Sequence, residues 1–97
     1  MELIQGAAAT LVRGLDLTHE EAIELIVRGL RSEMAKRQIS LEALDIRPRA
    51  ERTAFIRNVV KTVQDEIAGR HIWPKSKIES VVMEFMHILH DSWLGES

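Results

Sequence analysis

Basic side chains are concentrated in the middle of the chain, where they could recognise an acidic partner. Segment 28–61 carries nine Lys or Arg residues against four Asp or Glu residues, whereas segments 1–27 and 62–97 are acidic and the whole chain has a net charge of −2. Guanidinium and ammonium groups bind carboxylates and phosphates through charge-assisted hydrogen bonds. We therefore expect five of these residues to contact a partner. They are Arg47, Arg49, Arg52, Arg57 and Lys61.

Two classes of acidic partner are compatible with this segment. The sequence Ser-Leu-Glu-Ala-Leu at 40–44, followed by a longer helical stretch, resembles the first half of repressor-type helix-turn-helix domains, whose second helix enters the DNA major groove. The usual turn glycine is missing, Arg47-Pro48 occupies its region, and the chain lacks the basic excess of most nucleic-acid-binding domains. We therefore favour a protein partner and keep a nucleic-acid-binding regulator as the alternative.

A second group of side chains, near the end of the chain, has the residue types of a metal site. Glu84 and His87 have the spacing that puts a carboxylate and an imidazole on one helix face in carboxylate-bridged di-iron bundles. Such sites need two of these pairs and further carboxylates directed into the core. Here both side chains, with His90 and Asp91, fall opposite the apolar stripe of their helix, which favours a solvated face. We expect no metal and no cofactor; a zinc ion held by His87 and Asp91 is the alternative.

No residue pattern in the chain indicates an enzyme. The chain contains no cysteine, which excludes thiolate catalysis, disulfides and cysteine-ligated metals. It has no glycine-rich phosphate-binding loop, and no serine has neighbours that would activate it as a nucleophile. We expect a non-enzymatic protein without catalytic residues.

The elements that position these side chains follow from four stretches of apolar residues at three- and four-residue spacing, the period of an amphipathic helix. We predict helices over 2–13, 19–37, 48–68 and 75–94, with a short helical turn near 40–45. Connections this short favour neighbouring helices packed side by side. The prediction is a single all-α domain over 1–97, built as a compact bundle of four amphipathic helices.

The apolar stripes of these helices form the predicted core, and polar residues define the helix ends. Thr18 and Glu21 have the spacing of a capping box, and Ser40 is a second N-cap. Gly14 and Gly69 have the position of C-terminal caps. The stripes are Leu3, Ile4, Ala7, Ala8, Leu11 and Leu15; Ala22, Ile23, Ile26, Val27, Leu30 and Met34; Phe55, Ile56, Val59, Val60, Val63 and Ile67; and Ile78, Val81, Val82, Phe85, Ile88, Leu89 and Trp93.

A few large apolar residues lie outside these stripes and are candidates for partner binding. Trp73 lies in the linker before the last helix, where its ring either closes the end of the bundle or anchors a contact. Met83 falls on the polar side of the last helix, and Leu25 falls beside the stripe of the second. We add Trp73 and Met83 to the partner-binding residues. The first helix is apolar enough to pack against another chain, so a homodimer is a second possible assembly.

The chain shows no sign of a membrane or secretory destination. Its most apolar stretch, 6–12, is too short to cross a bilayer. A secretory signal begins with basic residues, and no basic residue precedes Arg13. The absence of cysteine is compatible with a reducing compartment. We expect a cytoplasmic protein with no membrane partner.

One local resemblance involves the residues around the capping box. Arg13-Gly14-Leu15, Leu17-Thr18, Glu20-Glu21-Ala22 and Leu25-Ile26-Val27-Arg28-Gly29 resemble the C-terminal helical segment of the Suf scaffold proteins of iron–sulfur cluster assembly. The resemblance covers 13–29, under a fifth of the chain. Because this chain lacks the β-helical body and any cysteine, no cluster ligand or cluster function carries over.

Overall fold

The computed structural model describes residues 2–94, and these residues form an all-α bundle without strands, as predicted. The four long helices agree with the predicted ranges to within two residues at each end, and the short helix is the predicted turn. The helices are α1 (Glu2–Leu15), α2 (His19–Arg37), α3 (Leu41–Leu44), α4 (Arg49–Gly69) and α5 (Lys75–Leu94). No helix within the described residues is both long and apolar enough to cross a membrane.

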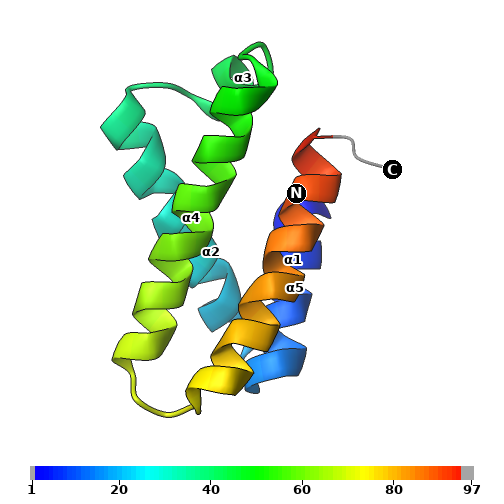
Figure 1. The fold of residues 1–97 in the computed structure, drawn as a ribbon, viewed down its shortest axis with the longest axis vertical. Coiled ribbons are helices and arrows are strands. Elements are labelled where there is room, and N and C mark those ends of the chain that lie inside the picture. The colour runs from blue at the N-terminus through cyan, green and yellow to red at the C-terminus, as the bar shows by residue number, and fades with distance from the viewer. Residues whose placement is uncertain (1, 95–97) are drawn as a thin grey trace.

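The four long helices form two layers (Figure 1). In that view α4 and α5 lie in front, α1 lies behind α5, and α2 crosses behind α4 at an angle. Each long helix packs against two others, because α1 and α4 both contact α2 and α5. The chain therefore passes down, up, down and up through the bundle, with α3 between α2 and α4 at one end.

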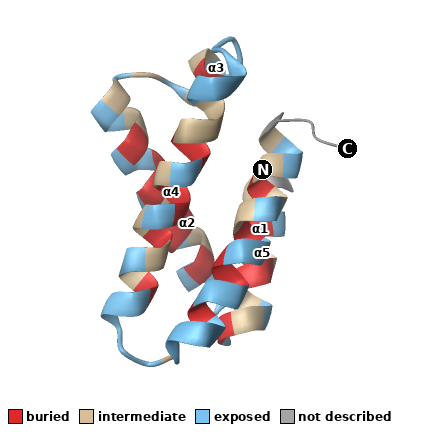
Figure 2. Cartoon of the chain, in the orientation of Figure 1, coloured by how far each residue is buried: buried red, intermediate tan, exposed pale blue. Residues whose placement is uncertain are grey.

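The core lies between the two layers, where the buried residues gather on the inward faces of the helices (Figure 2). The six residues predicted for the stripe of α4 are all buried, and Phe55 of α4 and Phe85 of α5 are the largest fully buried side chains. In α1 the small residues Ala7 and Ala8 are fully buried beside Leu11. Most of the buried apolar residues that drive folding thus belong to the predicted stripes.

The buried face of α2 differs from the predicted stripe. Leu25, predicted to lie beside the stripe, is only 2 % exposed, so that prediction was wrong, whereas Ile23 and Val27 are half-buried. The face is centred on positions that also include Gly29 and Glu33. The prediction used apolar residues only, so it left out Gly29 and Glu33. The predicted stripe is therefore rotated around the helix axis relative to the face that is buried.

The predicted N-terminal caps are present. The Thr18 hydroxyl accepts a hydrogen bond from the Glu21 backbone N–H at 3.1 Å, and the Glu21 carboxylate accepts one from the Thr18 backbone N–H at 3.2 Å. This reciprocal pair is a capping box. At α3, the Ser40 hydroxyl accepts a hydrogen bond from the Ala43 N–H at 3.1 Å. Both caps satisfy backbone donors that have no partner inside their helices.

The predicted glycine caps are wrong, and Gly14 has a different role. α1 continues through Gly14 to Leu15, and the left-handed residue that ends it is Asp16, with φ 57°. A Cβ atom added at Gly14 would lie 2.5 Å from Cγ2 of Val81, so the missing side chain allows α5 to approach α1 closely. At the end of α4, likewise, the residue with positive φ is His71 and not Gly69.

Candidate protein-binding surface

The predicted basic residues do not share one face of α4. Arg52 and Lys61 are nine positions apart, which puts them about 180° from each other around the helix axis. Arg52 is half-buried, whereas Lys61 is exposed. Near the start of α4, Arg47 and Arg49 are also exposed, and Arg47 lies 3.8 Å from the carboxylate of Glu51. The basic segment therefore divides into groups with different surroundings.

Arg52 holds the start of α4 against the end of α5. Its Nη1 donates a hydrogen bond to the backbone carbonyl of Trp93 at 3.3 Å. The last carbonyls of a helix carry a partial negative charge, which a guanidinium group stabilises. Beside this contact, the ring of Trp93 lies 5.9 Å from that of Phe55, centroid to centroid. The surroundings of Arg52 thus give it a packing role inside the fold.

Three of the predicted partner-binding residues meet in one groove between α4 and α5. Arg57, Lys61 and Met83 line this groove, whose volume is about 540 Å³. Its floor includes the side chains of Val60 and Val82. Met83 is 58 % exposed and gives this groove an apolar side chain that is accessible to a partner. The full lining is Arg57, Val60, Lys61, Gln64, Asp65, Glu79, Val82, Met83 and Met86.

The charged side chains of this groove separate by sign along its length. Arg57 and Lys61 lie toward the start of α4, whereas Asp65 lies one turn further along the same helix. Because α5 runs antiparallel to α4, Glu79 near its start lies at the Asp65 end, and it also shares a neighbouring depression with Gln64. All four charged residues are exposed, and none of their side chains forms an ion pair or hydrogen bond with another residue within 2–94.

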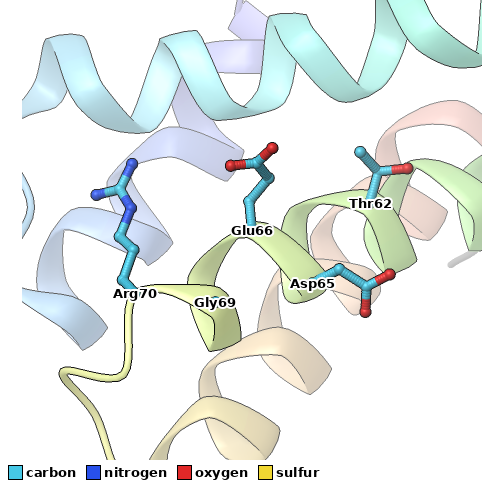
Figure 3. Close-up of a pocket in the computed structure, with 5 residues that line it drawn as sticks. All are labelled: Thr62, Asp65, Glu66, Gly69 and Arg70. Atoms are coloured by element: carbon cyan, nitrogen blue, oxygen red, sulfur yellow. The ribbon is translucent and has the colours of Figure 1, made fainter.

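The opposite side of α4, facing α2, has its charges paired. A depression of about 470 Å³ lies there. In Figure 3 the side chains of Glu66 and Arg70, which line it, point toward α2, and that of Asp65 points away. Arg28 of α2 pairs with Glu66 at 3.3 Å, and Arg70 pairs with Glu21 at 3.6 Å. On this side, ion pairs within the chain therefore connect α4 to α2.

One of these pairs belongs to the capping box. Hydrogen bonds from the backbone N–H and the hydroxyl of Thr18, together with the charge of Arg70, outweigh desolvation and hold the pKa of Glu21 below its usual value. Glu21 thus remains ionised where it serves both the cap of α2 and the contact with the end of α4.

Trp73 closes the end of the bundle at the α4–α5 connection. Its Nε1 donates a hydrogen bond to the backbone carbonyl of Leu15 at 3.1 Å, and the side chain is half-buried. This bond satisfies a carbonyl at the end of α1 that has no partner inside the helix. The residue also lines the depression that continues the groove past Gln64 and Glu79. The hydrogen bond to Leu15 agrees with the predicted role of closing the bundle, and the role in partner binding stays a prediction.

Glu33 is a buried charged residue that could not be predicted from the apolar pattern. It is 2 % exposed and accepts hydrogen bonds from Nε of Arg37 and from Nδ2 of Asn58, the latter at 2.8 Å. Desolvation would raise the pKa of Glu33, but these hydrogen bonds, with the charges of Arg37 and Lys36, outweigh it and hold the pKa below the usual value of 4.5. Two features of the sequence could have indicated this residue. Glu33 is four positions before Arg37, the spacing of an ion pair on a helix, and three positions after Leu30 of the apolar stripe.

The side chains considered as metal ligands lie on the outer side of α5. Glu84, His87 and Asp91 are exposed, and Glu84 lies 3.7 Å from Arg13 of α1. Within the described residues, no three His, Asp or Glu side chains come together in a way that could hold a metal ion. Their surroundings match the solvated face predicted from the helical pattern.

Comparison with known proteins adds no relative. No protein-family model, curated protein or solved structure matches the chain. The resemblance of residues 13–29 to the Suf scaffold proteins is therefore not supported by a match. The function has to be inferred from the geometry of the groove.

Proposed function

We propose that this chain is a small non-enzymatic adaptor or regulatory module that binds another protein, or a second copy of itself, through the groove between α4 and α5. The observation that best supports the proposal is the composition of this groove. Its floor is apolar and includes the exposed Met83, and its rim carries four charged side chains that have no partner within residues 2–94.

An apolar centre with a charged rim is how protein-binding surfaces are usually built. Burial of Met83 and the neighbouring Met86 against a partner would supply the affinity, and the flexible methionine side chains can fit an irregular surface. The charges of the rim would orient the partner and speed its approach. Arg57 and Lys61 would face acidic groups of the partner, as the charge of this segment predicts.

Site-specific photocrosslinking tests this proposal. A photoreactive benzoylphenylalanine at position 83, in cells that naturally produce the chain, should give a covalent adduct with a protein bound in the groove. The matched control carries the same group at Lys77, which is exposed on the same helix but lies about 120° away from Met83 around the axis. We expect adducts from position 83 and few from position 77, measured by mass spectrometry.

Charge reversal in the groove sharpens this test. Arg57→Glu combined with Lys61→Glu should reduce the adducts from position 83 severalfold, because the rim would then repel the acidic groups that it attracts in the wild type. Equal adduct yields from positions 83 and 77, or no adduct at all from position 83, would contradict the proposal.

A further inference from the structure

The groove between α4 and α5 is complementary in charge to itself. Its basic end carries Arg57 and Lys61, and its acidic end carries Asp65 and Glu79. Residues 57 and 65 of α4 are eight positions apart, or about 12 Å along the helix axis. Lys61 and Asp65 are one helical turn apart, so the basic and acidic halves of the groove meet there, and each half carries two charges of one sign.

This pattern fits a two-fold axis through the middle of the groove. In an isologous dimer, each residue that contacts a second residue across the interface is repeated by symmetry in the opposite direction. With two copies of α4 antiparallel, the basic end of each groove faces the acidic end of the other. Met83, which lies between the two ends, would meet the same region of its counterpart.

Building on the proposed function, we infer that the occupant of the groove is a second copy of this chain, bound face to face as an antiparallel two-fold dimer. The balance of charge carries this inference, because a rim with two bases and two acids is matched by an inverted copy of itself. A dimer would also give partners to these four charged side chains, which have none within residues 2–94. Between α2 and α4, by contrast, Arg28 pairs with Glu66 and Arg70 pairs with Glu21.

The apolar surface around the groove supports the same arrangement. Among the described residues, three large apolar side chains stand out as exposed: Ile46, Ile72 and Met83. Met83 lies in the groove, and Ile72 lies in the connection that joins α4 to α5. Dimerisation over this face would bury Met83 and could extend to Ile72, which removes apolar surface from water.

A charge exchange between two variants tests the dimer. One variant, Arg57→Glu with Lys61→Glu, makes the whole groove acidic; the other, Asp65→Lys with Glu79→Lys, makes it basic. In sedimentation equilibrium the wild type should show a reversible monomer–dimer equilibrium. Each variant alone should associate at least about tenfold more weakly, because like charges then meet at both ends of the interface. An equimolar mixture of the two should restore association, because opposite charges meet at both ends of the mixed dimer.

A third variant separates this result from an effect of net charge. Arg31→Glu with Lys77→Glu changes the net charge as much as the first variant, but at exposed positions outside the groove. We expect it to dimerise like the wild type and not to gain affinity for the basic variant. Circular dichroism checks the folding of every variant, and the single reversals Arg57→Glu and Asp65→Lys replace any pair that fails to fold.

The outcomes distinguish this inference from the proposed function. A wild type that stays monomeric at all concentrations, a mixture that does not associate, or a control variant that behaves like the acidic one would overturn the dimer. If the dimer is absent but position 83 still crosslinks to a different protein, the proposed function stands and only the identity of the occupant is wrong. A crosslinked adduct of twice the chain mass supports both.

Discussion

Among the described residues, Glu33 is the only charged residue whose side chain is buried. A carboxylate removed from water is costly unless donors replace its hydration. Arg37 provides one donor from the next turn of α2, and Asn58 provides another from α4. Glu33 therefore links two helices through a group that a pattern of apolar residues cannot reveal.

The lowered pKa of Glu33 predicts how its contribution to stability depends on pH. Because the pKa in the folded state lies below the usual value of 4.5, ionised Glu33 stabilises the fold fully above that value, and this stabilisation is lost as the pH falls through the folded-state pKa. Glu33→Gln should lower the free energy of unfolding by about 2 kcal/mol at neutral pH. The difference from the wild type should shrink below pH 4.5, as followed by urea unfolding over a pH series.

Glu24→Gln is the control for this experiment. Glu24 also pairs with an arginine at i,i+4, Arg28, but both side chains are exposed. An exposed pair of this kind contributes little, so its removal should change stability by well under about 1 kcal/mol. The stabilising role of ionised Glu33 would be refuted by either of two results. One is a loss of unfolding free energy in Glu33→Gln that is no larger than in Glu24→Gln, and the other is a loss that stays constant down to low pH.

At the scale of helices, the contact of Gly14 with Val81 sets the distance between α1 and α5. Gly14→Ala should destabilise the protein by about 1–3 kcal/mol, because the added methyl group overlaps the Val81 side chain, whose χ1 angle has little freedom. The matched control is Gly6→Ala on the same helix, where no atom lies within 4 Å of the new Cβ. That substitution should stabilise by about 0.5–1 kcal/mol through helix propensity alone. Thermal unfolding of both variants provides the comparison.

A double variant identifies the cause of this loss. Val81→Ala removes the methyl groups that the new side chain would meet, so Gly14→Ala with Val81→Ala should cost less than the sum of the two single changes. Additive losses, or a stabilising Gly14→Ala, would show that close packing at this position is not the reason for the glycine.

Much of the fold could be predicted from the sequence, because helix periods and caps are local signals. The ranges of the long helices, the capping box at Thr18 and the stripe of α4 all follow from residues within a few turns of one another. The role of Gly14 and the burial of Leu25 depend on helices from elsewhere in the chain. They could not be predicted because periodicity does not specify which helix lies opposite.

For the whole molecule, the structure shows which charges are paired. The pairs Arg28–Glu66 and Arg70–Glu21 join α2 to α4 across long separations in the sequence, so residue spacing could not reveal them. The charges of the α4–α5 groove could equally have been paired within the chain. The sequence analysis predicted Arg57, Lys61 and Met83 as partner-binding residues, but their common location and the acidic end formed by Asp65 and Glu79 required the fold.

The distribution of basic residues also bears on nucleic-acid binding, the alternative considered for this chain. Duplex binding needs basic side chains that reach phosphates from one face. Here Arg52 contacts the end of α5, and Lys61 lies on the other side of α4 next to acidic residues. We expect no binding to a labelled DNA duplex at low salt, measured by fluorescence anisotropy. Salt-dependent binding that Arg49→Ala and Arg52→Ala weaken would instead support the alternative.

The contact between α1 and α5 joins the first and last helices of the chain, whereas the other contacting pairs of long helices are consecutive long helices in the sequence. Bringing such distant segments together has a larger entropic cost, so this contact tends to form late in folding. Contacts absent from the transition state mainly slow unfolding. We therefore expect the close packing of Gly14 on Val81 to affect the rate of unfolding more than the rate of folding.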